Sequence, residues 1–483
     1  MNKPSFLDAA DLRAESTGLS YFEKVWDEHA IDNVGDGIWL LQVDRLFLHE
    51  VTGSVSLREL RRAGHSVDSP MQVSTVIDHV ISTRPGRHAD EGRDAVASEM
   101  IRETSAAARR ESIRLIDAAD ERQGIVHVVS PETGLALPGL TVVCGDSHTC
   151  TVGGIGAIGW GIGSSECNHV LATQALLQSK PKTMRIVFDG ALNPGVTAKD
   201  LALFLIGTHG ASLGIGHAVE FSGSAIDAME IEERLTLCNM GVEFSAKYAF
   251  VAPDEKTFAY VKDRQYAPKG DEWLQAVVYW RSLSTDPGAR FDVEIRIDCA
   301  EIQPQVTWGT SPQHAAAILA RIPDPSVMQA ADARELAERA LSYQGLTAGT
   351  ALAEVPIDVA YIGSCTNARL SDLRAASTVL KGRKIASGVI GICVPGSSAV
   401  RRQAESEGID RIFIEAGFEW LESGCAMCAS GGANQLAGKR VISTTNRNFE
   451  NRQGPGTRTH LASPVTVAAS AIHGRITAAV GLD

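Results

Sequence analysis

The sequence has no block of lysines and arginines and no long apolar run. Its 45 basic side chains face 58 acidic ones, so the formal net charge is -13, which disfavours nucleic acid and anionic lipid as partners. No stretch is long and apolar enough to cross a bilayer. The start, MNKPSFLDAADLRAESTG, carries acidic residues where a secretory signal has a continuous apolar core. We therefore expect a cytoplasmic protein that binds neither nucleic acid nor membrane.

Low-complexity tracts and repeats of solenoid period are also absent. The composition, with 44% hydrophobic and 21% charged residues, excludes a largely disordered chain. Since 483 residues are too many for one ordinary core, we expect several domains packed together.

Short β-branched runs repeatedly end in a loop of small polar residues and are followed by a helical pattern, which predicts an α/β fold. Open α/β sheets bind their ligands at the carboxyl ends of strands, where these loops lie. The units are LTVVCG (140–145) before DSHTCTVGGIG and a helical stretch at 164–178, VPIDVAYIG (355–363) before SCTNAR and LSDLRAASTVLKG, and VIGICVPG (389–396) before AVRRQAESEG.

Two changes of pattern suggest domain boundaries. A new strand and helix begin within residues 178–200 after a Lys/Pro pair, and residues 320–332, ARIPDPSVMQAAD, form a proline-rich bridge. We expect three domains, at residues 1–180, 181–320 and 321–483.

Nine cysteines are present, and in a chain without an export signal they are expected to be thiols. Cys425 and Cys428 are three positions apart, and Cys365 lies where a strand meets a helix, whose N-terminal dipole would lower its thiol pKa. A structural zinc site would need a fourth ligand. Three cysteines can instead hold an iron–sulfur cluster by three corners, which leaves one iron open; spacing alone does not exclude three buried thiols.

Several other motifs combine histidines, carboxylates and arginines. The loop STTNRNFENRQG (443–454) contains two arginines, which recognise carboxylates bidentately. A histidine beside a carboxylate can deliver a proton near neutral pH, and a helix over CNMGVE would place its Asn and Glu on one face. The candidate acid–base and binding residues are Asp78, His79, His127, Asp146, Ser147, His148, Asn239, Glu243, Asn446, Arg447 and Arg452.

Together these motifs resemble the aconitase superfamily, and within it the family of 3-isopropylmalate dehydratase large subunits. The resemblance runs from YFEKVWDEHA to the C-terminus and includes GSCTNAR, GCAMC, STTNRNFENRQG, CGDSHT, TLCNMGVEF, APDEKTF and QVTWGT. It implies three α/β/α domains around a central 4Fe-4S cluster, with the swivel domain absent. It also implies a hydro-lyase that isomerises 2-isopropylmalate and 3-isopropylmalate, hydroxy-diacids, by dehydration and rehydration.

The resemblance also implies roles for single residues. Asp78 and His79 would serve hydroxyl departure, while His127 with Asp146 and His148 with Glu243 would form supporting dyads. Cys365, Cys425 and Cys428 would bind the cluster; the residues implied to contact substrate or cluster are Ser147, Asn239, Asn446, Arg447 and Arg452. The serine base of single-chain relatives has no counterpart here. A small subunit carrying the swivel domain is therefore expected as partner, and the chain alone is expected to be inactive.

Four positions depart from the family pattern. Val55, Val80 and Val152 replace polar residues close to the proposed ligands, and ASGG (429–432) follows Cys428 where the family has another sequence. These changes favour, as an alternative, a paralogue acting on another 2-substituted malate. An RNA-binding regulator and a purely structural cluster are further alternatives. The pattern GIGAIG (154–159) lies too far beyond its strand for a dinucleotide site, so its glycines are expected to let backbone approach the cluster pocket.

Overall fold

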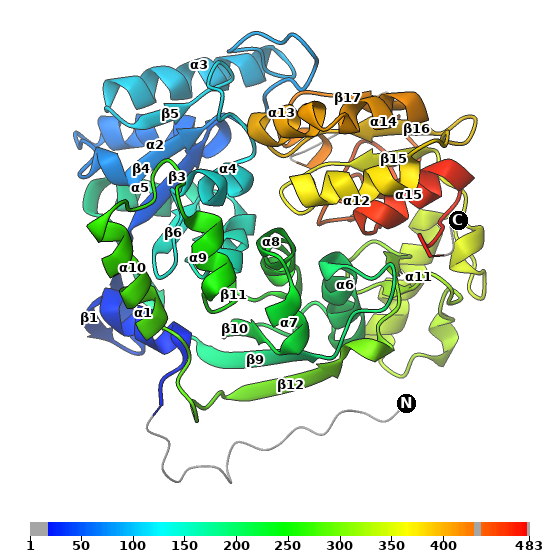
Figure 1. Cartoon of the computed structure of the whole chain (residues 1–483), viewed down its shortest axis with the longest axis horizontal. Coiled ribbons are helices and arrows are strands. Elements are labelled where there is room, and N and C mark those ends of the chain that lie inside the picture. Colours follow the sequence, from blue (N-terminus) through cyan, green and yellow to red (C-terminus); the bar gives the residue numbers. More distant parts are fainter. Residues whose placement is uncertain (1–17, 429–435, 481–483) are drawn as a thin grey trace.

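The computed structural model describes residues 18–428 and 436–480. Three parallel sheets, each covered by helices, make up the body of the molecule (Figure 1). The first sheet has the order β5 (Arg114–Ile116), β4 (Val73–Val76), β3 (Arg45–His49), β6 (Thr141–Cys144) and β7 (Ile158–Gly161). The second has the order β11 (Tyr248–Phe250), β10 (His217–Ser222), β9 (Lys182–Asp189) and β12 (Val293–Asp298). The third has the order β17 (Phe418–Trp420), β16 (Ile390–Cys393), β15 (Val359–Ile362), β18 (Arg440–Ser443) and β19 (Arg458–Leu461).

Two small antiparallel sheets complete the strands: β1 (Ala30–Gly35), β2 (Ile38–Gln42) and β8 (Ala175–Ser179) form one, and β13 (Gln305–Thr307) with β14 (Ala315–Ala317) the other. The α-helices are α1 (Tyr21–His29), α2 (Glu50–Arg62), α3 (Ala95–Arg110), α4 (Val126–Thr133), α5 (Ser164–Thr173), α6 (Ala198–His209), α7 (Ser224–Ala228), α8 (Ile231–Asn239), α9 (Glu255–Val261), α10 (Asp271–Ser282), α11 (Ala331–Gln344), α12 (Leu370–Leu380), α13 (Ser398–Ser406), α14 (Ile409–Ala416) and α15 (Pro464–His473). Two 3-10 helices lie near the site described below, η3 (Ser147–Ile155) and η4 (Met240–Phe244).

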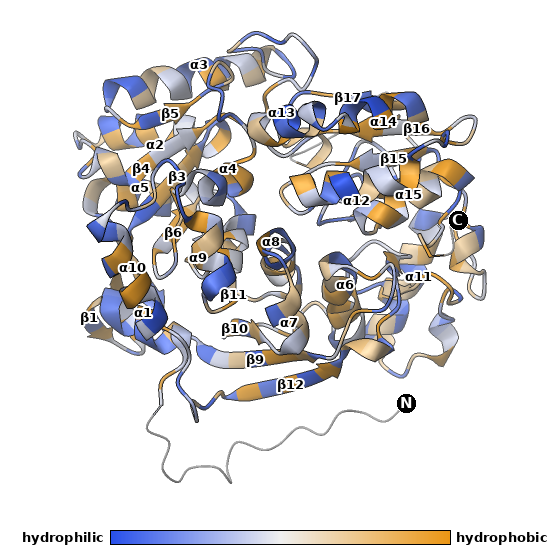
Figure 2. Ribbon diagram, viewed as in Figure 1, coloured by the Kyte–Doolittle hydropathy of each residue, from blue (hydrophilic) through white to orange (hydrophobic). Residues whose placement is uncertain are grey.

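Most of the parallel strands are buried under the helices that pack on the sheets, whereas β12 alternates between buried and exposed residues. All four residues of β4, β6, β15 and β18 are buried, as is typical of strands inside a parallel sheet. Figure 2 shows the same division among helices: α15 is largely hydrophobic, whereas α13 is largely hydrophilic, in agreement with their burial. The predicted α/β class is confirmed.

The helix expected over residues 164–178 is shorter than the sequence pattern indicates. It ends at Thr173, because Gln174 adopts a left-handed conformation with φ 51° and ψ 28°. Residues Ala175–Ser179 then form β8, whose alternating burial matches its antiparallel pairing with β2. Tertiary pairing thus overrides a stretch of helix-forming leucines and glutamines.

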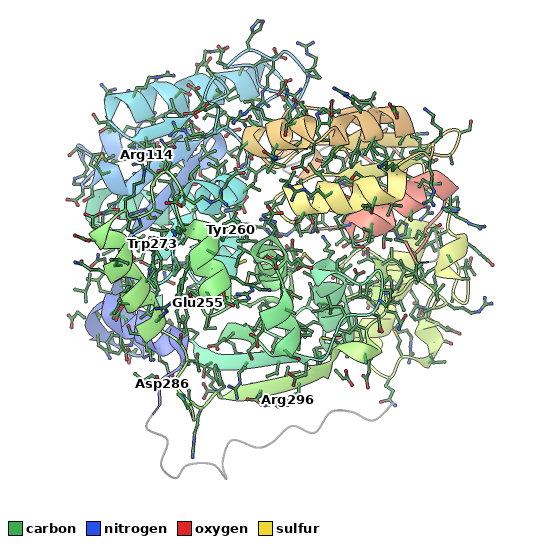
Figure 3. All side chains as sticks on the ribbon, in the orientation of Figure 1. Arg114, Glu255, Tyr260, Trp273, Asp286 and Arg296 are labelled. Carbon is green, nitrogen blue, oxygen red and sulfur yellow. The ribbon has the colours of Figure 1, made fainter. Side chains whose placement is uncertain are left out.

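Helices α9 and α10 lie between β11 and β12 of the second sheet in the chain but pack on the first sheet. Phe258 and Trp280 join the same buried cluster as Phe47 and Val76 of the first sheet. Figure 3 shows Tyr260 and Trp273 on these two helices. The expected boundaries at residues 180 and 320 lie between the three parallel sheets in sequence, and they stay a prediction.

The glycines of GIGAIG allow close packing between neighbouring elements, and the expected approach of their backbone to the cluster pocket stays a prediction. A Cβ on Gly154 would lie 2.5 Å from the backbone nitrogen of Leu235 in α8. Gly156 has φ +77°, and a Cβ there would lie 2.9 Å from Pro253. The glycines therefore allow η3 to approach α8 and the segment after β11.

Among the described residues, no helix combines the length and the apolar character that a membrane crossing requires.

A buried carboxyl group in the second sheet gives a stability prediction. Glu220 of β10 is 3% exposed and accepts hydrogen bonds from Oγ1 of Thr285 at 2.9 and 3.0 Å. Burial raises the pKa of Glu220 to about 7. Because the folded-state pKa lies above the unfolded one, the folded protein loses stability as pH rises from about 4.3 through the folded-state value.

Glu220→Gln should therefore raise the free energy of unfolding at pH 8 by about 2–3 kcal/mol, an advantage that fades toward pH 4. Glutamine keeps an oxygen to accept the bond from Thr285. Thermal unfolding followed across this pH range measures the effect. Glu419→Gln, at an exposed position of β17, is the control and should change little; an equal gain at pH 8 and pH 4 would contradict the prediction.

Candidate active site

The predicted site residues come mainly from the carboxyl ends of strands in the first and third sheets. In the first sheet, Asp78 and His79 follow β4 and Asp146 follows β6. In the third, Cys365 follows β15, Cys425 follows β17 and Asn446 follows β18. The second sheet contributes Asn239 and Glu243 at the end of α8 and in η4. Residues far apart in the sequence thus meet where α/β sheets bind ligands.

Three buried thiols belong to the site, and two of them contact one side-chain amide. Cys365, Cys425 and Cys428 are 5%, 6% and 7% exposed and form no disulfide. The Asn446 amide donates to Sγ of Cys365 at 3.5 Å, and its oxygen accepts from Sγ of Cys428 at 3.5 Å. Asn239 donates a second bond to Sγ of Cys365 at 3.1 Å. Such N–H donors stabilise thiolates that bind metal.

The loop of Cys425 rests on the histidine–carboxylate group of the first sheet. Its backbone N–H donates to the carbonyl of Asp78 at 2.8 Å, and its Sγ donates to Oδ2 of Asp78 at 3.6 Å. The same Sγ lies 3.8 Å from Nδ1 of His79. The thiols and the acid–base residues therefore form one continuous site.

Burial raises the pKa of Cys365 and Cys428, and that of Cys425 well above its usual range. The expected effect of a helix N-terminus on Cys365 is absent, because α12 begins only at Leu370, five residues later. Cys365 instead follows Ser364, whose φ is 93°, in a tight turn after β15. Three buried thiols, with N–H donors on Cys365, suit a metal cluster, which requires thiolates and favours them by its positive charge.

Asp146 lies at the centre of three histidines. Its Oδ2 is 2.7 Å from Nε2 of His79, and its Oδ1 is 3.3 Å from Nε2 of His127 and 3.4 Å from Nδ1 of His148. The backbone N–H of His148 also donates to Oδ1 at 2.6 Å. Burial opposes ionisation, but the nearby His127, His148 and His79 hold the pKa of Asp146 well below its usual range.

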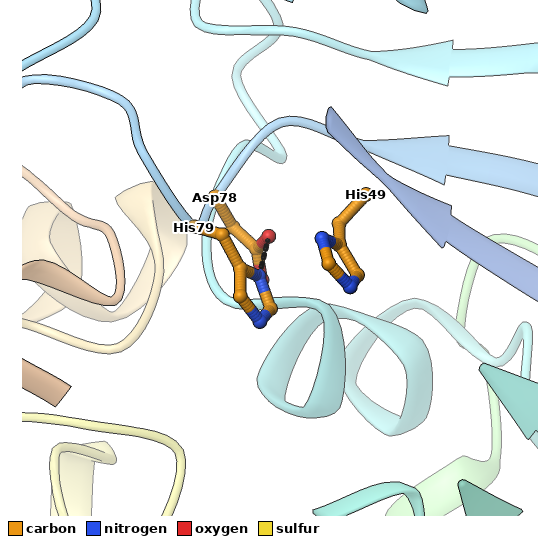
Figure 4. A group of neighbouring side chains, drawn as sticks. All are labelled: His49, Asp78 and His79. Atoms are coloured by element: carbon orange, nitrogen blue, oxygen red, sulfur yellow. Dashed lines mark hydrogen bonds and ion pairs between the residues drawn. The ribbon is translucent and has the colours of Figure 1, made fainter. Parts of the chain in front are cut away.

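His79 is held between two carboxylates. Its Nδ1 lies 2.6 Å from Oδ1 of Asp78, as the dashed line in Figure 4 marks, and its Nε2 faces Asp146. Burial alone would lower the pKa of His79, yet Asp78, Cys425 and Asp146 raise it well above its ordinary value. The protonated imidazolium is thus the favoured state, as a proton donor requires.

His148 and Glu243 form the second predicted pair, with Nε2 of His148 2.7 Å from Oε1 of Glu243. Arg447 reaches the same oxygen with its Nε at 2.9 Å. Burial opposes protonation of His148, but Asp146 and Glu243 raise its pKa.

Asn239 and Glu243 do not share one α-helix as expected. The helix α8 ends at Asn239, and Glu243 lies in the 3-10 helix η4. Asn239 is fully buried, with its amide on Cys365 and Oγ1 of Thr151. The 3-10 helix η4 still brings Glu243 to His148. Asn239 and Glu243 therefore reach the site from different directions.

Arg452 and Ser147 complete the predicted set. The Arg452 guanidinium lies 5.2 Å from the ring centroid of Phe449, and its Nε is buried with no hydrogen-bond partner among the described residues. Such a donor suits a carboxylate ligand. Oγ of Ser147 lies 3.5 Å from Nδ1 of His148.

The sequence reasoning missed His49 and Glu50 at the carboxyl end of β3. The ring of His49 stacks on that of His79, with 3.7 Å between centroids and an angle of 12° (Figure 4). Glu50 is fully buried and accepts hydrogen bonds from the backbone N–H groups of Asp78, at 3.0 Å, and Val80. His49 ends a buried strand and Glu50 follows it directly, which is the signal that could have identified both residues.

His49, Asp78 and His79 offer ligand atoms that all lie within 4.8 Å of one another. Both ring nitrogens of His79 already face carboxylates, however. We therefore interpret this group as part of the acid–base network.

Two of the unusual valines pack in apolar clusters. Val152 lies with Phe47 and Ile155 in one buried cluster, and Val80 lies with Ile77 and Ile101 in another. Both valines adjoin a proposed ligand in the sequence, but their side chains pack among apolar residues and are not directed toward a substrate. The segment ASGG (429–432) lies outside the described residues.

Comparison with known proteins agrees with this geometry. The profile of the Aconitase family (aconitate hydratase) matches residues 23–474. The 3-isopropylmalate dehydratase large subunit 1 of Bradyrhizobium diazoefficiens is 51% identical over 465 residues, which cover 96% of each chain. Both matches extend over all three parallel sheets and every cysteine of the site. The chain therefore belongs to the aconitase family.

Proposed function

We propose that this chain is the large subunit of a 3-isopropylmalate dehydratase, a hydro-lyase that interconverts 2-isopropylmalate and 3-isopropylmalate in leucine biosynthesis. The observation that carries the proposal is the 51% identity over 96% of both chains to a relative of that name. Three buried thiols beside an Asp–His network support it, because this chemistry needs a metal centre and a proton donor together.

The cofactor that fits the thiols is a 4Fe-4S cluster held by Cys365, Cys425 and Cys428. Such a cluster would supply a Lewis acid for the substrate hydroxyl and a neighbouring carboxylate. Asn239 and Asn446 donate to the sulfur of Cys365, so we assign them to the cluster side of the site. Their part in substrate binding stays a prediction.

We assign the proton for the departing hydroxyl to Nε2 of His79. Nδ1 is tied to Asp78, which is fully buried, whereas Nε2 faces Asp146, whose side chain is 17% exposed. The more open side of the ring is therefore the one that a substrate can approach. Asp146 holds the imidazolium in place and is itself oriented by His127 and His148.

Arg447 and Arg452 are the groups proposed to bind substrate carboxylates, since guanidinium groups recognise them bidentately. Removal of the carbon-bound proton needs a base, and the base of single-chain relatives lies on their swivel domain. We propose that a separate small subunit supplies it.

Arg447→Gln should raise KM for the hydroxy-diacid about 10- to 100-fold, because a charge-assisted hydrogen bond contributes about 1.5–3 kcal/mol. A smaller fall in kcat is expected through the lost contact with Glu243. Steady-state kinetics of the iron-loaded complex measures both constants. Arg339→Gln, which removes an exposed pair with Glu450 at 3.0 Å, is the matched control; an unchanged KM in Arg447→Gln would contradict the assignment.

The proposed function is tested with the chain purified anaerobically together with its small subunit. We expect turnover of 2-isopropylmalate at a higher kcat/KM than citrate or 2-methylmalate, and none by the chain alone. An iron-loaded complex that leaves isopropylmalate unchanged would refute the proposed substrate. A preference for 2-methylmalate would favour the paralogue alternative.

A further inference from the structure

A fully buried lysine lies beside the cysteine site. Lys199 is the second residue of α6, which flanks the second sheet, and its relative exposure is 0%. Its Nζ donates to the backbone carbonyls of Thr444, at 2.9 Å, and Thr445. These two residues follow β18 in the third sheet and directly precede Asn446.

The partners of Lys199 carry no full negative charge. Among the described residues no carboxylate oxygen lies within 4.0 Å of its Nζ, and the segment 429–435, ASGGANQ, contains no acidic residue. The neighbouring Asp200 is engaged elsewhere, because it caps α6 through Thr197 and accepts from the backbone of Gln305. A buried ammonium without a counter-ion is strongly unfavourable.

The Asn446 loop joins Lys199 to two thiols of the site. Burial lowers the pKa of Lys199 to about 8, and the leading influences in the opposite direction are the Cys428 and Cys365 thiolates. Both thiols contact the Asn446 amide, which follows the carbonyls bound by Lys199. The hydroxyl of Thr444 also accepts from the backbone N–H of Gly363, two residues before Cys365.

We propose that Lys199 is the buried counter-ion of the iron–sulfur cluster and positions the Asn446 loop against two of its ligands. Three thiolates outweigh the positive charge of an oxidised 4Fe-4S core, so the ligated cluster is an anion. A cation held in a dry environment stabilises that anion, and stabilises the reduced cluster more, since its negative charge is larger. Lys199 therefore raises the reduction potential and favours cluster retention. This inference rests on the cluster of the proposed function.

The test compares Lys199→Gln and Lys199→Met, which remove the charge, with Lys199→Arg, which keeps it. Redox titration of the anaerobically loaded chain should give a more negative midpoint potential for the Gln and Met variants, with Arg closer to wild type. Lys256→Gln is the matched control, because Lys256 also donates to two backbone carbonyls from the first turn of a helix. Its potential should equal that of wild type.

Thermal unfolding of the cluster-free chain provides a second measurement. If the cluster is the counter-ion, the apoprotein contains an unbalanced buried charge, so the neutral variants should keep their Tm without cluster and gain less on loading than wild type. Unchanged potentials in loaded neutral variants would overturn the inference, as would neutral variants that fail to fold as apoprotein while Lys199→Arg folds. A wild-type chain that binds no cluster would instead refute the proposed cofactor.

Discussion

Replacing Cys365, Cys425 or Cys428 with alanine should reduce bound iron and sulfide to background and abolish activity of the complex with the small subunit. Each thiol is buried among polar donors or carboxylates rather than in a purely apolar core, so its loss removes a ligand and leaves two that cannot hold the cluster. Metal analysis after anaerobic reconstitution, with visible absorption, measures the loss.

Cys393→Ala is the matched control for the three ligand variants. Cys393 ends β16 beside β15 and is equally buried, but it lies in the apolar cluster that includes Ile362 and Phe413. We expect this variant to bind iron at the wild-type level. A full complement of iron in Cys365→Ala would show that the cluster has another ligand set.

Asp146→Asn should lower kcat about 100- to 10,000-fold while iron content stays at the wild-type level, because the variant loses acid–base catalysis and keeps the thiols. Asparagine has nearly the same size but no charge to hold the three histidines. The carboxylate of Asp146 raises the pKa of His79 and His148. In the variant, the alkaline limb of the kcat profile, where the proton donor is lost, should therefore move to lower pH.

Asp44→Asn gives a matched comparison, since Asp44 also pairs with a histidine, with 2.7 Å from its Oδ2 to Nε2 of His29. We expect this variant to lose some stability with an unchanged pH profile. If Asp146→Asn and Asp44→Asn alter kcat and its pH dependence equally, Asp146 has no special part in the reaction.

Local sequence patterns predicted the strands and loops of the site because one short stretch carries both the signal for a strand and the signal for the loop that follows it. A buried β-branched run followed by small polar residues led correctly to the loops of Asp146 and Cys365. His79 and His148 were identified because carboxylates are adjacent in sequence or in a recognised motif. The family expectation from these motifs is confirmed by the match over residues 23–474.

Long-range packing accounts for what the sequence did not disclose. Lys199 looks like an ordinary residue of a solvated first helical turn, yet it contacts a loop 245 residues later in the chain. Val80 and Val152 adjoin proposed ligands in sequence, but the strand and turn geometry directs them into apolar clusters. Glu50 accepts hydrogen bonds from backbone N–H groups 28 and 30 residues away. No pattern of side chains in the sequence indicates such a contact with the backbone.

The bond from the Cys425 backbone to the carbonyl of Asp78 also bears on how the protein matures. The first sheet and its Asp–His loop are synthesised long before the last two cysteines emerge. The backbone contact of Cys425 therefore lies on a part of the chain that is synthesised 347 residues earlier, and all three thiols can come together only once residue 428 has been added. On the proposed cluster assignment, a nascent chain truncated before residue 428 presents no complete set of ligands, so iron delivery must come after that point in synthesis.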